Sequence, residues 1–400
     1  MTRRITGTPH DTTGEHAATD TVPNSPALHT SRKGFLRGGA LAAGIGAAGA
    51  AGVLGPATPA QARPGVNPNP RARRPEITRL ATLTGPGITT RFRMEATDLG
   101  IPAITPDGRI LLIFGDTFEG AKVGAGFWRS PVGLYADPDV KLKKGLRWTG
   151  AVGGETAEQL VEYSHDGPLS TILPADVITI GDTMYLWVML NAGLGNVTGT
   201  EIWTSTDSGE TWERTAEMFA PDHLDGFSQQ CTWALNEADG HVYALTTGFQ
   251  RDKEVILQRV PKESILDPDA YEVYGTDGWG VGDPVHVIGG HVGEMCLRVV
   301  EDKWVLTYFN AGLYRVDCLV FDSAEKLTEP PLFADTLFWG CNWGREDDER
   351  VAQLYGPYIL PGSTLDDMHV ALSQWQTGPD WPYHVQQYRV QGIGREIAAL

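Results

Sequence analysis

The sequence predicts an all-β protein, a five-bladed β-propeller. Five segments of comparable layout recur over residues 90–392, each made of short apolar runs separated by turn residues. Amphipathic helical periodicity is almost absent from them, and Gly and Pro are frequent, at 48 and 26 residues. Units of about four strands are typical of blades around a central channel. Two β-sandwich domains are the alternative.

The bulk composition narrows the class of ligand. The chain has 400 residues, a formal net charge of −18 at pH 7 and 41% apolar residues. Such an acidic surface repels nucleic acid and anionic lipid, so a neutral or weakly charged ligand is expected. Twelve residues each of Trp, Tyr and Phe suit an aromatic-lined site. The number of subunits stays open.

The four cysteines indicate neither a cofactor nor a metal site. No C-x-x-C spacing relates Cys231, Cys296, Cys318 and Cys341, so a zinc site is not expected. One or two disulfides could form after export, and burial by packing is the equally open alternative. The prediction is a protein without a cofactor.

The N-terminus is predicted to direct export. Residues 1–30 are polar, turn-rich and aperiodic, which predicts disorder. Residues 31–37 (Ser-Arg-Lys-Gly-Phe-Leu-Arg) resemble the twin-arginine motif with Lys in place of the second Arg, and a weakly hydrophobic stretch follows over 38–54. Residues 60–62 (Ala-Gln-Ala) then predict cleavage after Ala62. We therefore expect a secreted or cell-envelope protein without a membrane anchor; an uncleaved anchor is the alternative.

The rest of the chain divides into a linker and one domain. After the disordered N-terminus and signal peptide of residues 1–62, residues 63–80 form a linker rich in Pro, Asn and Arg, and residues 81–395 form the propeller. Five units are expected within it, at residues 98–140, 170–212, 227–260, 291–321 and 354–390.

The first unit carries a hairpin with two acidic residues. Residues 96–118 read as two strands joined by a Pro-Asp-Gly turn at 106–108. If the hairpin closes on Asp107, Asp98 lies directly opposite Asp116, with Cβ atoms roughly 4.5–5.5 Å apart. Facing carboxylates disfavour joint ionisation, which indicates a functional site. The alternative is that both side chains cap turns.

The second unit contains two apolar strands and an Asp box. The strands cover 171–180 and 183–190, and the box, Ser-Thr-Asp-Ser-Gly-Glu-Thr-Trp, covers 205–212. The box predicts a turn between outer strands with its Trp packed into the blade. It resembles sialidase-like propellers, but a single box without a recognisable Arg triad disfavours that activity. Asp176, early in this unit, is a further candidate to face the channel.

The third to fifth units repeat the pattern of strands across a turn. Turn residues occupy 237–240 in the third unit and 301–303 in the fourth. The fifth contains strands at 370–375 and 383–390. Residues 262–266 predict a short helical turn between units.

Three acidic residues are candidates for catalysis. Asp98 and Asp116 fall at the same end of the first blade, and Glu294, in Gly-Glu-Met, begins the fourth unit across the channel. Glycoside hydrolysis needs one carboxylic acid to protonate the leaving oxygen and one carboxylate on the anomeric side. Unequal environments separate two such pKa values. For Glu294 the alternative is a solvated residue at a strand end.

Several aromatic and polar residues are candidates for binding sugar. Arg251 and Gln229 could hydrogen-bond hydroxyl groups. Aromatic side chains could offer flat faces to a sugar ring, although many such residues pack in the core. The aromatic candidates are Trp128, Tyr355, Trp375, Tyr358, Trp381 and Tyr383.

Five short motifs occur at the ends of the predicted strands: Thr97-Asp98-Leu99-Gly100, Phe114-Gly115-Asp116-Thr117-Phe118, the Asp box, Gly293-Glu294 and Tyr355-Gly356-Pro357-Tyr358. Together, these motifs resemble the actinobacterial DUF4185 family, which is associated with endo-D-arabinanases of glycoside hydrolase family 183. The resemblance covers most of residues 90–392 and implies a five-bladed propeller. It also implies cleavage of α-D-arabinofuranosyl linkages in arabinogalactan or lipoarabinomannan, with Asp98 and Asp116 as the catalytic pair.

The sequence thus predicts an exported glycosidase that cuts internal linkages of a cell-wall arabinan. One Asp of the pair is the general acid and the other a base or nucleophile, with inversion favoured by analogy. The alternative is a non-catalytic, carbohydrate-binding propeller of the cell envelope.

Overall fold

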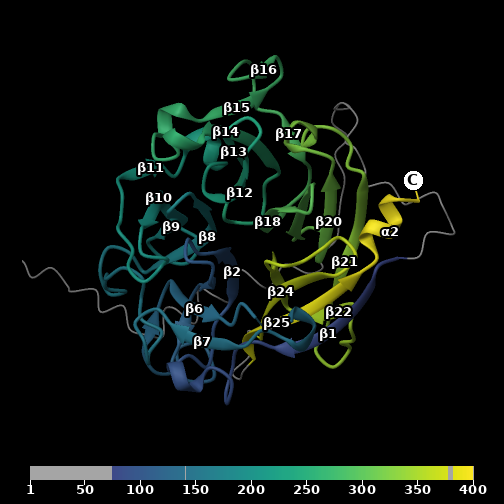
Figure 1. Ribbon diagram of the computed structural model, residues 1–400. Helices are drawn as coiled ribbons and strands as arrows, with labels where there is room; N and C mark the ends of the chain where they lie inside the picture. The colour runs from purple at the N-terminus through teal and green to yellow at the C-terminus, as the bar shows by residue number, and fades with distance from the viewer. Residues whose placement is uncertain (1–73, 140, 377–381, 400) are drawn as a thin grey trace, which may run out of the picture.

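The structure, a computed structural model, is a five-bladed β-propeller, as predicted (Figure 1). It describes residues 74–139, 141–376 and 382–399, so the predicted signal peptide and Trp381 lie outside the described residues. Among the described residues, no helix is long and apolar enough to cross a membrane.

Each blade is an antiparallel sheet whose first strand lies against the channel. Blade 1 contains β2 (Leu99–Ile104), β3 (Ile110–Phe114), β6 (Val132–Ala136) and β7 (Trp148–Ala151). Blade 2 contains β8 (Thr171–Ile180), β9 (Thr183–Asn191), β10 (Val197–Ser205) and β11 (Glu217–Phe219). Blade 3 contains β12 (Gln230–Asn236), β13 (His241–Thr247), β14 (Val255–Pro261) and β15 (Glu272–Gly275).

The last two blades complete the ring. Blade 4 contains β18 (Val292–Val300), β19 (Lys303–Asn310), β20 (Arg315–Phe321) and β21 (Phe333–Cys341), with β22 (Arg350–Ala352) parallel to β21. Blade 5 contains β23 (Leu354–Ile359), β24 (Met368–Trp375), β25 (Tyr383–Gln391) and, outermost, β1 (Glu76–Thr82). The first strands β2, β8, β12, β18 and β23 contact one another in sequence around the channel.

A few short elements lie outside the regular blades. The ladder of β4 (Thr117–Phe118) with β5 (Trp128–Arg129) extends blade 1, and β16 (Gly278–Trp279) and β17 (His286–Ile288) extend blade 3, where β16 projects from the ring (Figure 1). The helix α2 (Ile393–Ile397) ends the described chain. The 3₁₀ turns are η2 (Thr90–Phe92), η3 (Leu142–Lys144), η4 (His223–Gly226), η5 (Lys262–Ser264, as predicted), η6 (Pro268–Ala270) and η7 (Ala324–Lys326).

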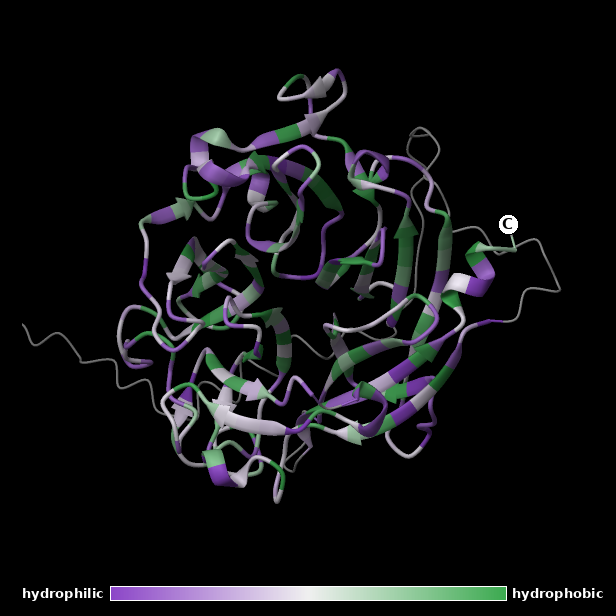
Figure 2. Cartoon of the chain, in the orientation of Figure 1, coloured by the Kyte–Doolittle hydropathy of each residue, from purple (hydrophilic) through white to green (hydrophobic). Residues whose placement is uncertain are grey.

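The core lies between the blades. The strands are rich in β-branched and aromatic residues, and hydrophobic residues gather along them while many loops are hydrophilic (Figure 2). Buried residues form clusters that pack one blade against the next, with Trp187, Trp203 and Trp233 among the largest fully buried side chains. Cys231, Cys296, Cys318 and Cys341 are free thiols, the first three of them buried, so packing accounts for these residues.

The N-terminal strand closes the ring. β1 pairs antiparallel with β25, so that blade 5 joins the first and the last strand of the described residues. The sequence placed the start of the propeller at residue 81, which assigned residues 76–80 to the linker. Those residues belong to β1, because they pair with β25. The sequence did not show this strand, since β1 has mostly exposed or half-buried positions and no continuous apolar run.

The acidic hairpin has a different register from the predicted one. The turn is centred on Asp107 as expected, since Ile104 pairs with Ile110. A β-bulge then inserts Gly100, with φ of 88°, and Leu99 pairs with Phe114. Asp98 therefore lies opposite Gly115, whose N–H donates to the Asp98 carbonyl at 3.3 Å. The predicted direct opposition of Asp98 and Asp116 is wrong by one residue.

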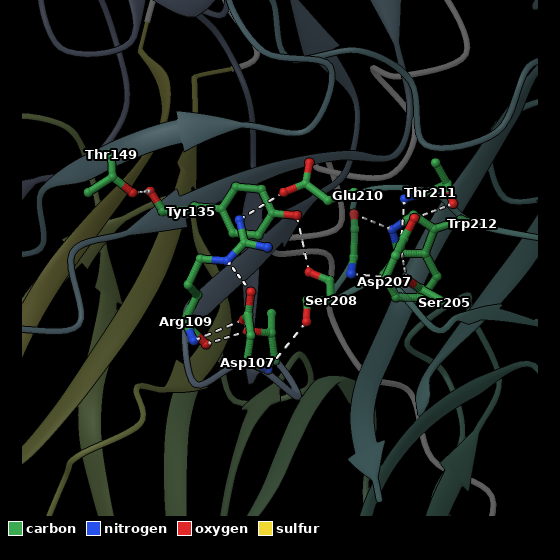
Figure 3. Close-up of polar contacts among 12 residues, drawn as sticks. Asp107, Arg109, Tyr135, Thr149, Ser205, Asp207, Ser208, Glu210, Thr211 and Trp212 are labelled. Carbon is green, nitrogen blue, oxygen red and sulfur yellow. Dashed lines mark hydrogen bonds and ion pairs between the residues drawn. The ribbon is translucent and has the colours of Figure 1, made fainter. Parts of the chain in front are cut away.

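The Asp box joins blade 2 to this hairpin (Figure 3). Within the box, Asp207 Oδ1 accepts the Thr211 N–H at 2.9 Å, and the indole of Trp212 is buried, as predicted. Towards blade 1, the Asp107 N–H donates to Ser208 Oγ at 3.2 Å, and Arg109 Nη1 lies 2.8 Å from Glu210 Oε1. The box thus supports the turn of the acidic hairpin.

An ion pair joins the inner strands within the channel. Asp176, fully buried on β8, accepts hydrogen bonds from Arg298 Nη2 on β18 at 2.7 Å and from Thr232 Oγ1 on β12 at 2.6 Å. Arg298 Nη2 also donates to the Pro102 carbonyl on β2 at 3.1 Å. The Asp176–Arg298 pair therefore ties blades 1 to 4 together, a structural role in which the buried charge of Asp176 is compensated.

Candidate active site

The candidate site lies where the inner strands begin at one mouth of the channel. Asp98 immediately precedes β2, Glu294 is the third residue of β18, and Tyr355 is the second residue of β23. Asp116 follows β3, which runs antiparallel to β2 and so returns to the same mouth. The positions that open inner strands in three blades thereby converge, as the sequence predicts for Asp98, Asp116 and Glu294.

Asp98 is held in an environment that favours its protonated form. The Tyr355 hydroxyl donates to Oδ2 at 2.8 Å, whereas Oδ1 is shielded from solvent and has no hydrogen-bond partner among the described residues. Burial and the nearby negative charge of Asp116 raise the pKa of Asp98 to about 7. Hydrogen bonds from the hydroxyl groups of Tyr383 and Tyr355 lower this pKa and so oppose part of the shift. Asp98 can therefore carry a proton near neutral pH.

Glycine at position 115 makes room for the Asp98 carboxyl group. A Cβ on Gly115 would lie 2.5 Å from Asp98 Oδ1 and 3.1 Å from a methyl group of Leu99. Such a contact is too close for any side chain, so the Phe-Gly-Asp motif allows the two acidic residues to approach. This is the physical reason for Gly115 between β3 and Asp116.

Asp116 is surrounded by hydrogen-bond donors. Trp128 Nε1 donates to Oδ1 at 2.9 Å, and Thr171 Oγ1, at the start of β8, donates to the same oxygen at 2.7 Å. Burial raises the pKa of Asp116, and the bonds from Thr171 and Trp128 oppose that shift by stabilising the carboxylate. The two acidic residues thus have unequal surroundings.

Trp128, a predicted sugar platform, packs against other aromatic rings in the wall of the site. Its ring stacks with His165 at 3.8 Å between centroids and with Phe118 at 5.9 Å. The indole therefore packs in the wall and orients Asp116. The sequence analysis did not identify Thr171 or His165 as residues of the site. Thr171 could have been found from its position, because it begins the inner strand of blade 2 just as Asp98 precedes the inner strand of blade 1.

The buried Glu294 and the partly exposed Arg251 form an ion pair beside Asp98. Arg251 Nη2 lies 2.5 Å from Glu294 Oε1, and its guanidinium group lies 5.1 Å from the centre of the Tyr355 ring. Glu294 Oε2 is buried without a hydrogen-bond partner among the described residues. A Cβ on Gly293 would lie 3.1 Å from Arg251 Cγ and 2.9 Å from Phe309, so glycine allows the Arg251 side chain to cross β18. The ion pair with Arg251 fixes the position of the Glu294 carboxylate beside the acidic pair.

Two further predicted binding residues, Gln229 and Trp375, contact other parts of the protein. Gln229 uses both ends of its side chain between loops: Nε2 donates to the Pro221 carbonyl at 2.8 Å, and Oε1 accepts the Phe249 N–H at 3.0 Å. It is therefore a loop clamp. The Trp375 ring lies 5.6 Å from that of Tyr383 at the end of β24, so Trp375 forms a partly exposed outer layer of the wall.

This arrangement supports proton transfer by two carboxyl groups. A carboxyl group protonated near pH 7 can donate a proton, and a hydrogen-bonded carboxylate can accept one. Among the residues that the structure describes, no three His, Cys, Asp or Glu side chains come together as ligands for a metal ion.

Comparison with known proteins identifies relatives across most of the propeller. A family model described as "Domain of unknown function (DUF4185)" matches residues 84–389. A 35.9 kDa protein of Mycolicibacterium smegmatis, named for its place in the asd 3′ region, is 30% identical over 333 residues, covering 79% of this chain and 98% of its own. Notoamide biosynthesis cluster protein J′ of Aspergillus versicolor is 26% identical over 323 residues, covering 72% of this chain and 83% of its own.

A solved structure shares the fold. It is a protein of Bacteroides ovatus, provisionally described as a hydrolase, with a TM-score of 0.52 and 16% identity, covering 76% of this chain and 88% of its own. At that identity the likeness extends to the propeller alone.

Proposed function

The chain belongs to the DUF4185 family, and we propose that it is a glycoside hydrolase that cleaves internal α-D-arabinofuranosyl linkages. The observation that carries the proposal is the pair of carboxyl groups at the channel mouth, the partly buried Asp98 and the buried Asp116, which lie in unequal environments. Two carboxyl groups in unequal environments can divide the roles of acid and base that the hydrolysis of a glycosidic bond requires. The resemblance of the hairpin motifs to family 183 endo-D-arabinanases supports D-arabinan as the substrate.

In the proposed mechanism, Asp98 is the general acid and Asp116 the general base. Asp98 gives its proton to the glycosidic oxygen as the bond from that oxygen to the anomeric carbon breaks. A water molecule attacks the anomeric carbon from the opposite side, and Asp116 takes the proton that this water loses. The products are two chain fragments, and the configuration at the anomeric carbon is inverted.

The roles follow from the surroundings of each carboxyl group. Asp98 has the pKa of about 7 that suits an acid, and its Oδ1 has no partner within the described residues. Asp116 accepts two hydrogen bonds on one oxygen, which favours the carboxylate that a base requires. Burial and the charge of Asp116 are the main reasons for the raised pKa of Asp98, and Glu294, which is paired with Arg251, adds only a small contribution.

We further propose that the protein is exported by the twin-arginine pathway with cleavage after Ala62 and acts on arabinogalactan or lipoarabinomannan outside the cell. The signal-like motif at 31–37 supports export. The match to a Mycolicibacterium protein supports a substrate of the mycobacterial cell-wall type.

The test is an activity screen of the purified protein on arabinogalactan and lipoarabinomannan. Internal cleavage would release a ladder of arabino-oligosaccharides, and NMR during the first turnovers would show the anomer opposite to that of the substrate. An L-arabinan serves as the control polysaccharide. Binding to arabinogalactan without release from any arabinan would contradict the proposal and favour a carbohydrate-binding propeller.

A further inference from the structure

Both hydrogen-bond donors of Asp116 belong to segments that contact one histidine. Trp128 Nε1, on β5, and Thr171 Oγ1, at the start of β8, donate to the same carboxylate oxygen. His165 lies in the connection from blade 1 to blade 2, residues 152–170, and contacts both Trp128 and the residue before Thr171. It is thus placed to hold one donor relative to the other.

The imidazole of His165 stacks closely on the indole of Trp128. Their ring centroids are 3.8 Å apart, and the ring planes differ by 14°. Phe118 is also nearly parallel to the indole, at 5.9 Å and 18°. Tyr163 makes a T-shaped contact with the imidazole, at 4.9 Å and 64°. These ring contacts limit rotation of the indole, and so fix the direction in which its Nε1–H group points.

His165 is itself anchored to the start of β8. Its Nδ1 lies 2.7 Å from the Ser170 carbonyl oxygen, and because a carbonyl only accepts hydrogen bonds, Nδ1 is the donor. Ser170 is held in turn, since its N–H donates to the Asn191 carbonyl at 2.7 Å and its Oγ accepts the Gly193 N–H at 2.7 Å. The ring that stacks on Trp128 is therefore fixed to a well-bonded part of blade 2.

We propose that His165 is a positioning residue that holds the Trp128 N–H on Asp116 and so keeps Asp116 in its carboxylate form. The inference rests on the proposed function, in which Asp116 takes a proton from the attacking water, and extends it to the residue that prepares this base. A hydrogen-bond donor that is fixed in advance needs no reorganisation when the reaction begins. The stack is the essential contact, because it is the one that reaches Trp128.

The surroundings of Asp116 give the Trp128 bond a measurable effect. Burial raises the pKa of Asp116, whereas the bonds from Thr171 and Trp128 and a positive charge on His165 lower it. Losing the Trp128 bond should therefore raise the pKa, so that Asp116 becomes protonated, and fails as a base, at higher pH. The titratable groups that face Asp116 are Asp98 before β2, His165 and Tyr163 before β8, and Tyr383 at the start of β25.

Rates across a pH range test the positioning role. In His165→Ala the stack is lost, so the acid limb of kcat/KM should move up by about one pH unit, the effect of one hydrogen bond to a carboxylate. His165→Asn keeps a donor for the Ser170 carbonyl but has no ring, and should behave like His165→Ala. His165→Phe keeps a stacking ring and should move the limb by less than about 0.3 pH units. The alkaline limb, which Asp98 sets, should stay in place in all of them.

A matched control comes from a histidine with similar contacts elsewhere. His223 stacks on Phe219 at 4.5 Å between centroids, and its Nδ1 lies 2.8 Å from Ser228 Oγ. His223→Ala should leave the acid limb unchanged. If His165→Phe moves the limb as far as His165→Ala, the charge of His165 or its bond to Ser170 is responsible, and the positioning role is overturned. No shift in His165→Ala or in His165→Asn would overturn it as well.

The hydrogen bond itself can be followed by NMR without catalysis. In protein with isotope-labelled tryptophan, the Trp128 Nε1–H signal is identified by its absence from Trp128→Phe. Its exchange with solvent should be at least about tenfold faster in His165→Ala and His165→Asn, and within about twofold of the unaltered protein in His165→Phe and His223→Ala. Equal exchange in all of these variants would overturn the inference. If exchange responds as expected but no arabinan is cleaved, only the proposed function fails.

Discussion

At the scale of single residues, the protonation of Asp98 determines when the site can act. A general acid must hold its proton, so with a pKa of about 7 the rate should fall about tenfold per pH unit above that value. The Tyr355 hydroxyl stabilises the charged carboxylate, so Tyr355→Phe should raise the pKa and move the alkaline limb of kcat/KM to higher pH. Tyr271→Phe, which loses a bond to the Ile265 carbonyl far from the site, is the control. A limb that stays in place in Tyr355→Phe would contradict the assignment.

The raised pKa of Asp98 should lower the free energy of unfolding of the protein at neutral and alkaline pH. Unfolding returns Asp98 to its ordinary pKa of 3.8 from about 7, so below pH 4 both states are protonated and the cost is small. As pH rises from 4 to 7 the unfolded state loses its proton first, and the folded state becomes relatively less stable. Asp98→Asn should therefore be more stable than the unaltered protein by up to about 4 kcal/mol at pH 8 and by much less at pH 4. Thermal melts at the two pH values measure this, and an equal difference at both would exclude the burial cost.

Sequence reasoning found the acidic residues better than their neighbours. Asp98, Asp116 and Glu294 stand out because charged residues at the ends of apolar strands have few structural roles. The roles of Trp128 and Gln229 depend on which side chains lie opposite them in space. Neither the stacking of Trp128 with His165 nor the bonds of Gln229 to two loops is visible in spacing along the chain.

At the scale of elements, the Asp box supports the hairpin that carries the acidic pair. Gly209 has φ of 87°, and a Cβ there would lie 2.4 Å from Leu111 Cδ2 on β3. Gly209→Ala should therefore lower the free energy of unfolding by about 2–3 kcal/mol, since it adds a clash to the backbone strain. Gly108→Ala is the matched control, because Gly108 has φ of 85° and nothing within 4 Å of its Cβ. Denaturant unfolding of both variants gives the comparison; equal losses would mean that the contact with Leu111 does not matter.

The position of the hairpin turn was predictable from the sequence, but the pairing of the two strands beyond the bulge was not. Turn chemistry placed the turn on Asp107, but a bulge at Gly100 moved Asp98 to face Gly115. A glycine in a strand allows a bulge without requiring one. The tertiary contact that accompanies it, from the Leu99 N–H to Ser373 Oγ on β24 at 2.8 Å, comes from a distant part of the sequence.

At the scale of the whole molecule, closure of the ring depends on β1. A chain that starts at Leu83 lacks the ladder with β25 and the buried Ile77, and leaves the edge of β25 open. Its melting temperature should be several degrees below that of a chain that starts at Arg74. Polysaccharide binding and activity should also be lower in the shorter chain. Calorimetry of the two truncated proteins tests this, and equal melting temperatures would show that blade 5 closes without β1.

The five repeated units predicted the architecture because each propeller blade consists mainly of strands and turns that follow one another in the sequence. Ring closure and the Asp176–Arg298 pair were not predictable, since each joins residues far apart in the sequence that have no pattern in common. For the same reason the approach of Arg251 to Glu294 appears only in the folded chain.

The most direct test of the central claim is the rate of oligosaccharide release from D-arabinan by the unaltered protein, Asp98→Asn and Asp116→Asn. Both variants keep side chains of nearly the same size but cannot exchange the proton that the mechanism needs. Each should lose at least about a hundredfold in kcat, with chain binding retained. Near-normal release by either variant would remove that residue from the chemistry and contradict the account.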